Sequence, residues 1–421
     1  MDLIIYTLKS VATAIVEPLH LLMLIIMGIM FYLKNKRIAI VQRMTIGESL
    51  DSPLELTLSQ VVLGVIAGVI GSLILAILGI TFHENSGIEF IFMISILILF
   101  YKNKFVDFVY SSSILAVLSL IFKLIGSIVN QPSFLKVDIL SLMSFVGVIY
   151  IIKGMLIMVD GSRGAIPVFT SKNGKIIGGF SLNRYWAMPV AVFMLFSGQI
   201  SSSSIVEDAP NWWPLINNAT TLGILATAMI ASIPFYGVIS YNTVTFTKKK
   251  KEKAIHSGIS ILIYGMSVIA VAQLSNIGVI GEIITVLYAP IAYELIMIYS
   301  KKDEAKGDYL YVSDEEGISV LEVAPSSPAF QAGIRRGDKI ISINGEKIQS
   351  ELEIFNIVKD NIFKLHIKIK KDAGDIVECL VQPKNRRLGI LLVPKMVKKE
   401  DILGVGHDDL KKILEDLKEK K

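Results

Sequence analysis

The stretch SSPAFQAGIRRGDKIISINGEKI, Ser326 to Ile348, determines the fold of the C-terminal part of this chain. Pro328 suits the first turn of a short helix, and Gly333 suits its end. Residues 338–344 then alternate apolar and polar side chains, which is typical of a half-buried strand. Asn344-Gly345 favours the tight turn of a hairpin. The stretch therefore predicts a helix, a strand and a hairpin within a small α+β domain.

Strand-like segments also flank this stretch on both sides. They alternate apolar with polar residues or are rich in β-branched residues, and they cover residues 317–323, 364–371, 375–382 and 388–394. Ser350 and Glu353 have the spacing of a capping box. We therefore expect an amphipathic helix to begin there and to end near Asp360.

This order of elements resembles a PDZ domain over residues 308–395. The residues that carry the resemblance are Ser327-Pro328-Ala329, Ala332-Gly333, Gly337-Asp338, Ile340, Ile343-Asn344-Gly345 and Ile348. The arrangement is similar to the circularly permuted bacterial type, in which the carboxylate-binding loop and its strand come last. The resemblance implies binding of a peptide as an added strand, with backbone N–H groups that hold its C-terminal carboxylate.

The resemblance also assigns the peptide-binding residues. The loop and strand are formed by Arg387, Leu388, Gly389, Ile390 and Leu391, and the facing helix contributes Phe355 and Val358. Gly389 lets the backbone approach a ligand closely, and Arg386 and Arg387 add charge attraction. Two alternatives remain open: residues 388–392 form only a core strand, or residues 309–311 supply the strand of the groove.

The composition indicates an integral membrane protein. Hydrophobic residues make up 52% of the 421 residues, charged residues only 19%, and the mean hydropathy is +0.60, whereas soluble domains carry about 25% charge. We expect an α-helical multi-span domain at 1–300, a linker at 301–307 and a charged tail at 396–421. About nine runs could cross a bilayer; they are 11–33, 58–80, 88–101, 105–129, 137–159, 186–205, 219–241, 255–275 and 277–299. The third run is short enough to be a half-span or re-entrant segment.

Basic residues predict the orientation, because Lys and Arg favour cytoplasmic loops. The opposite loops carry Lys9 and Lys136. Alternate loops carry Lys34, Lys36, Arg37, Arg43, Lys102, Lys104, Arg163, Lys172, Lys175, Arg184, Lys248, Lys249, Lys250, Lys251 and Lys253. We therefore expect an N-terminus outside and a cytoplasmic PDZ-like domain.

Several other features allow two interpretations. The ionisable residues within spans are Glu17, Lys123, Lys153, Glu282 and Glu294; for Lys123, Lys153 and Glu294 snorkelling toward a span end is the simpler explanation. The segment 160–186 is either a solvated connector or a docking surface for the region after Tyr299 or for a partner. The helix expected at 407–421 either packs on the PDZ-like domain or contacts a partner or the membrane surface.

The sequence argues against an enzyme. An intramembrane metalloprotease needs two histidines one helical turn apart with an adjacent glutamate, and no pair among His20, His83, His256, His366 and His407 has that spacing. No G-x-S-x-G motif is present. We therefore expect no catalytic residue, no metal and no cofactor. The nearly neutral region after Ser300 also argues against nucleic-acid binding.

The whole-chain layout resembles the MinJ-like family of multi-spanning PDZ proteins, which determine the site of cell division in Firmicutes. The resemblance implies a scaffold at the cell membrane, enriched at septum and poles, that recruits MinD-like and DivIVA-like partners. An alternative is a regulatory or degenerate relative of PDZ-bearing membrane proteases that presents substrates to a partner enzyme. A transporter with a regulatory PDZ domain is a third possibility, for which the sequence offers little support.

Overall fold

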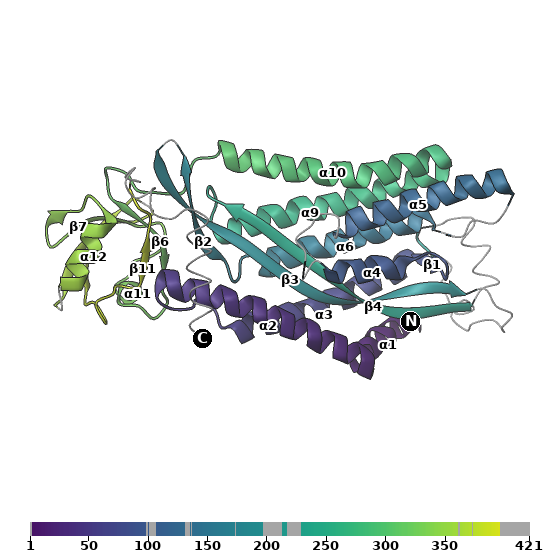
Figure 1. Cartoon of the computed structure of the whole chain (residues 1–421), viewed down its shortest axis with the longest axis horizontal. Coiled ribbons are helices and arrows are strands. Elements are labelled where there is room, and N and C mark those ends of the chain that lie inside the picture. The colour runs from purple at the N-terminus through teal and green to yellow at the C-terminus, as the bar shows by residue number, and fades with distance from the viewer. Residues whose placement is uncertain are drawn as a thin grey trace, which may run out of the picture.

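The fold consists of a long helical domain and a small β-rich domain at one of its ends (Figure 1). The computed structural model describes residues 2–97, 100, 107–130, 135, 137–172, 174–196, 213–216, 229–360, 363–372 and 374–395. The charged tail expected at 396–421, with its helix, lies outside these residues.

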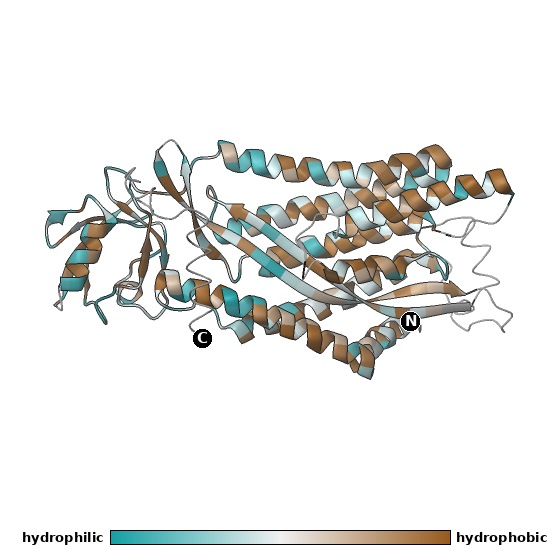
Figure 2. Cartoon of the chain, viewed as in Figure 1, coloured by the Kyte–Doolittle hydropathy of each residue, from teal (hydrophilic) through white to brown (hydrophobic). Residues whose placement is uncertain are grey.

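The helices of the first domain pack side by side along its long axis (Figure 1). They are α1 (Asp2–Val16), α2 (Pro18–Ile46), α3 (Pro53–Leu78), α4 (Ile88–Ile96), α5 (Phe108–Val129), α6 (Ile139–Asp160), α9 (Lys250–Ala272), the 3-10 turn η3 (Gln273–Ile277) and α10 (Val279–Lys306). Within the described residues, six helices are long and apolar enough to span a membrane: α2, α3, α5, α6, α9 with η3, and α10. Figure 2 shows apolar residues along most of their length. The described residues therefore contain six candidate spans, as expected of a membrane protein.

The first two differences from the predicted spans have a local cause. The run 11–33 is interrupted at Glu17, because Pro18 begins a new helix and α1 ends at Val16. The run 88–101 contains α4, which has only nine residues. That length is too short to cross a bilayer.

The larger difference is a long β-ribbon in place of two predicted helices. Residues of the runs 186–205 and 219–241 belong to β3 (Lys175–Phe196) and β4 (Met229–Thr245), which pair antiparallel from Phe180 opposite Thr245 to Phe196 opposite Met229. Non-helical backbone at membrane depth needs cover by protein. Every residue of β3 from Arg184 to Leu195 is buried, so the prediction of helices here was wrong.

Glycines allow the helices to cover this ribbon closely. A Cβ atom on Gly64 of α3 would lie 2.1 Å from the Ala187 carbonyl oxygen of β3, and one on Gly68 would lie 2.0 Å from that of Pro189. The two glycines therefore form a GxxxG pattern that lets helix backbone touch strand backbone. Gly147 and Gly154 of α6 have the same role against α9. A Cβ atom on either glycine would lie 2.7 Å from a backbone oxygen of α9, that of Gly265 or Gly258.

Three short strands complete the first sheet around β3. β1 (Thr81–His83) pairs parallel with its C-terminal end, and β2 (Ile166–Lys172) forms a hairpin with its N-terminal end. β5 (Tyr311–Val312) comes from beyond the helical domain and pairs antiparallel at Ile177 and Gly178. The segment 160–186 is thus largely strand and belongs to this sheet.

The C-terminal domain has a sheet in the order β10-β9-β7-β6-β11, with β8 beside β7. The strands are β6 (Ile318–Val323), β7 (Lys339–Ile343), β8 (Glu346–Lys347), β9 (Leu365–Lys370), β10 (Ile376–Val381) and β11 (Ile390–Leu392); the helices are α11 (Pro328–Gln331) and α12 (Glu351–Asp360). Its own core includes Ile340, Ile343 and Ile367. These elements agree closely with the segments expected from the sequence.

Candidate functional site

The predicted binding loop precedes the last strand of the C-terminal sheet. Among the described residues β11 pairs only with β6, with Ile390 opposite Val323. Gly389 has φ +74°, and its carbonyl oxygen accepts a hydrogen bond of 2.9 Å from the Ala324 amide. A Cβ atom there would lie 2.3 Å from Cβ of Ser327. The position therefore requires glycine for both its backbone angle and its space.

The side chains around the loop divide into core and surface. Leu388 is buried in the domain core, whereas Ile390 and Leu392 are half-buried against it. Arg386 and Arg387 are exposed beside the loop. Their charge is available to an anion that approaches Gly389.

Helix α12 presents apolar side chains to solvent. Phe355 is 60% exposed and Leu352 is 65% exposed, whereas Val358 is buried in the core. Of the two helical residues predicted to line the groove, Phe355 is thus accessible to a ligand, whereas Val358 packs α12 against the domain core. Leu352 and Phe355 lie one helical turn apart, and neighbouring exposed apolar side chains can form part of a protein-binding surface.

Comparison with known proteins identifies this domain. Residues 319–371 match the PDZ domain family. The C-terminal domain is a PDZ domain. The match ends before β11, so the assignment of residues 387–391 to the binding loop is a prediction that the comparison does not test.

The curated relatives are proteases and a PDZ protein that resemble the chain over short segments. Serine protease HTRA1 of Xenopus tropicalis is 33% identical over 66 residues, or 16% of this chain and 14% of the relative. A putative zinc metalloprotease of Brucella suis biovar 1 is 33% identical over 85 residues, or 20% of each chain. PDZ domain-containing protein 8 of Mus musculus is 35% identical over 57 residues, or 14% of this chain and 5% of the relative. The chain thus covers a fifth or less of the length of these relatives.

The PDZ domain is joined to the helical domain through the β2–β3 hairpin. Besides the pairing of β5 with β3, the Tyr311 ring packs edge-on against Phe180 at 5.6 Å between centroids. Leu321 and Val393 of the PDZ domain are fully buried in the core of the helical domain. Burial raises the pKa of the Tyr311 phenol above its ordinary value. The predicted docking surface in segment 160–186 is therefore occupied by the chain's own PDZ domain.

A buried carboxylate lies at the centre of this junction. Glu322 of β6 is 2% exposed; it accepts a hydrogen bond of 2.9 Å from Nζ of Lys250 and one of 3.1 Å from Nε of Arg336. Both cations also lie over the Phe180 ring, at 5.0 and 5.2 Å from its centroid. Glu322 and Arg336 belong to the PDZ domain, whereas Lys250 begins α9 of the helical domain. The ion pair between Glu322 and Lys250 therefore links the two domains electrostatically.

The end of α2 contacts the PDZ domain close to the binding loop. Glu48, just after α2, accepts a hydrogen bond of 3.0 Å from the Ser326 amide. A Cβ on the neighbouring Gly47 would lie 3.6 Å from Nη1 of Arg387. The predicted loop therefore faces the helical domain on one side.

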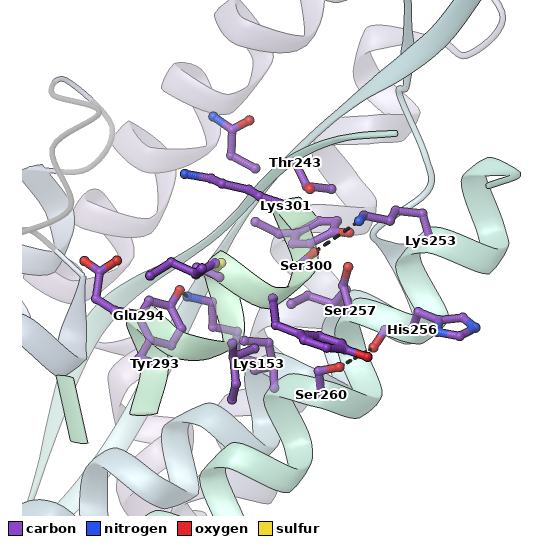
Figure 3. Close-up of a pocket in the computed structure, with 18 of the residues that line it drawn as sticks. Lys153, Thr243, Lys253, His256, Ser257, Ser260, Tyr293, Glu294, Ser300 and Lys301 are labelled. Atoms are coloured by element: carbon purple, nitrogen blue, oxygen red, sulfur yellow. Dashed lines mark hydrogen bonds between the residues drawn. The ribbon is translucent and has the colours of Figure 1, made fainter. Parts of the chain in front are cut away.

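The membrane domain contains a second candidate site, a cavity of about 1060 Å³. Its lining comes from α5 and the residue before it, α6, β3, β4, α9 and α10. It includes Asp107, Lys153, Lys253, His256 and Tyr293. Figure 3 shows Lys153 close to Tyr293 at one end and Lys253 bonded to Ser300 at the other. The mixture of apolar walls with a few converging polar groups is typical of a ligand pocket.

Ionisable residues of the spans are paired rather than independent. Lys153 is 4% exposed, and its Nζ lies 2.8 Å from Oδ2 of Asp107. The explanation of Lys153 by snorkelling was therefore wrong. Lys123 pairs with Glu282 at 2.9 Å, and Tyr110 donates a hydrogen bond of 2.6 Å to Glu294.

The buried ion pair between Arg184 and Asp160 was not predicted from the sequence. Arg184 is fully buried, and its Nε lies 2.9 Å from Oδ2 of Asp160, which also accepts a hydrogen bond of 2.9 Å from Nε1 of Trp186. Arg184 was assigned to a cytoplasmic loop. The sequence did offer a signal: Arg184 lies two residues before the apolar run 186–205, and Asp160 directly follows the run 137–159. In the described part of the chain, no group of three or more His, Cys, Asp or Glu residues could hold a metal ion.

Proposed function

We propose that the protein is a non-enzymatic membrane adaptor whose PDZ domain binds an extended or C-terminal segment of protein partners. The observation that carries the proposal is the β11 edge, which has no second strand partner in the described chain and is preceded by the exposed Arg387 and the glycine turn at Gly389. An extended peptide can pair with such an edge, and α12 supplies apolar contacts through Phe355. In this proposal the domain is of the permuted bacterial type.

The basic loops support a cytoplasmic location for the PDZ domain. The basic start of α9, the end of α10 and the β2–β3 hairpin all lie at the end of the helical domain that carries it (Figure 1). Basic residues favour the cytoplasmic side of a membrane. Partners would therefore be cytoplasmic proteins.

Binding of peptides to the full-length protein in nanodiscs tests the groove. We expect a peptide with a free C-terminal carboxylate to bind, its amidated form to bind more weakly, and Gly389→Trp to lose binding because that side chain has no room. Gly345→Asn is the matched control, since Gly345 also has positive φ but has no neighbouring atom within 4 Å of its Cβ position. If Gly389→Trp is folded and recovers the same partners as the unmodified protein, the groove is not the recognition surface.

The resemblance to the MinJ-like family suggests division-site proteins of the MinD and DivIVA type as the first partners to test. A fluorescent fusion should then be enriched at septa and poles, and deletion should disturb the placement of division. A uniform distribution around the envelope with normal division would contradict this assignment and leave the adaptor role itself intact.

The second candidate is a subunit that presents substrates to a membrane protease. The short similarities to a serine protease and to zinc metalloproteases favour it, and they lie in the region that is a PDZ domain. This role requires co-purification with a protease and accumulation of an uncleaved substrate when the gene is deleted. Neither result is expected of a division scaffold.

A further inference from the structure

The free edge of the PDZ sheet opposite to β11 has the properties of an interaction surface. Strand β10 is the last strand of the sheet and pairs only with β9 within the described residues. Three of its six side chains are large, apolar and exposed: Ile376 by 58%, Val377 by 40% and Leu380 by 56%. Edge strands are normally protected by lysine, proline or a bulge, because their unpaired backbone groups recruit other strands. β10 contains neither lysine nor proline.

The charges on and beside β10 restrict what can cover it. Glu378 is the one charged residue of the strand, and its carboxylate lies 3.9 Å from Nζ of Lys368 on β9. The strand is therefore an almost neutral, apolar edge. A partner strand must be apolar too and must not place an acidic group opposite Glu378.

A second copy of β10 satisfies these conditions in one antiparallel register. With Cys379 opposite Cys379 of the other copy, Val377 faces Val381, and Glu378 faces Leu380. The two Leu380 side chains then lie diagonally across the two-fold axis, within reach of each other. A register with Glu378 opposite itself would instead bring two carboxylates together. The alternation of side chains also agrees between the two strands. Odd-numbered residues lie opposite odd-numbered residues, and even-numbered opposite even-numbered, so each face of one strand continues on the same face of the other.

We propose that two copies of this chain associate by antiparallel pairing of their β10 strands, which joins the two PDZ sheets into one continuous sheet. This surface is separate from the peptide groove at β11, so the inference does not depend on the proposed function. It gives each dimer two grooves on opposite outer edges of the joined sheet.

Cys379 provides a direct test, because it is the only cysteine in the chain. Directly opposed residues in an antiparallel pair have Cα atoms roughly 4.5–5.5 Å apart, which is within the range of a disulfide. Oxidation of the full-length protein in membrane vesicles with copper phenanthroline should therefore give a cross-linked dimer of twice the 46.4 kDa mass. A single cysteine moved to position 377 in a Cys379→Ser background should cross-link several-fold less, because the two copies would lie roughly 13 Å apart.

Two substitutions at one exposed position separate strand pairing from random collision. Leu380→Glu would face Glu378 of the other copy, and we expect at least a tenfold loss of cross-linking. Leu380→Lys would face the same carboxylate with opposite charge and should retain cross-linking. Thermal unfolding of both variants controls for folding of the domain.

The other outcomes overturn the proposal. Equal yields from cysteines at 377 and 379, or equal behaviour of the two Leu380 variants, would indicate collision. A dimer that forms only after deletion of residues 397–421 would show that the tail covers β10. Absence of any cross-link at 379 with a folded protein would exclude this register and the interface with it.

Discussion

The substitution Glu322→Gln tests whether the PDZ domain is held to the helical domain by charge. The side chain keeps its shape but loses its negative charge, so Lys250 and Arg336 remain at a largely dry junction without a counter-ion. Removal of one partner of a buried ion pair costs about 3–5 kcal/mol, and hydrogen bonds to charged groups contribute about 1.5–3 kcal/mol each. Because Arg336 is 31% exposed, we take the lower end, about 3 kcal/mol.

A change of about 3 kcal/mol corresponds to roughly a 150-fold increase in the undocked population. Hydrogen exchange of the full-length protein measures this opening at the β3–β5 pairing, where Gly178 lies opposite Tyr311. We expect exchange there to accelerate by about two orders of magnitude, whereas exchange in the PDZ core at Ile340 should change little.

Asp372→Asn is the matched control for the docking experiment. Asp372 pairs with Lys249 at 2.6 Å across the same junction, but their side chains are 44% and 57% exposed. An exposed pair contributes about 0–1 kcal/mol, so we expect less than about a fivefold change. If Glu322→Gln and Asp372→Asn change the exchange rate equally, or if neither changes it, the buried ion pair does not hold the domains together.

Three further predictions concern single groups. Asp160→Ala should destabilise the purified protein by about 3–5 kcal/mol, and adding Arg184→Met should recover most of this loss in thermal unfolding, because no unpaired buried charge then remains; strictly additive losses would contradict the pairing. Partial burial raises the pKa of Asp314, but the hydrogen bond from Lys339, the charge of Lys339 and backbone hydrogen bonds together lower it more, so the pKa lies below the ordinary 3.8. The stability it contributes is present above pH 3.8 and is lost as the pH falls through the lower folded-state pKa, and Asp314→Asn should flatten this acid dependence of PDZ unfolding. Phe355→Ala should weaken peptide binding about five- to tenfold with a change in stability below about 0.5 kcal/mol, as titration and melting curves can check.

The local signals of the PDZ domain were strong enough to place its elements from the sequence. Asn344 and Gly345 both have positive φ, of 51° and 87°, as the predicted hairpin turn requires. The Ser350 hydroxyl accepts a hydrogen bond from the Glu353 amide at the start of α12, as the capping box predicts. Both features depend on residues close in sequence, which is why a single sequence was sufficient.

The β3–β4 ribbon could not be predicted in the same way. A continuous apolar run is compatible with a membrane helix and with a fully buried strand, and hydropathy does not separate them. Pro189 and Pro234 are compatible with kinks in membrane helices, but they lie opposite Tyr236 and Ala191 in the ribbon. What selects the strand is cover by α1, α3 and α4, and the glycines that permit it are distant in sequence. The pairing of Lys153 with Asp107 was missed for the same reason, because 46 residues separate them.

The continuity of β3 has a mechanical consequence. At about 3.3 Å per residue, its 22 residues extend over roughly 70 Å. The strand runs from its pairing with β5 near its N-terminal end to its pairing with β1 near its C-terminal end. A force applied along this strand would load the many hydrogen bonds between β3 and β4 in parallel, so they would have to break together rather than one after another. Tension on the PDZ domain would then yield first at the two-residue β3–β5 pairing, while the anchorage of β3 within the helical domain stays intact.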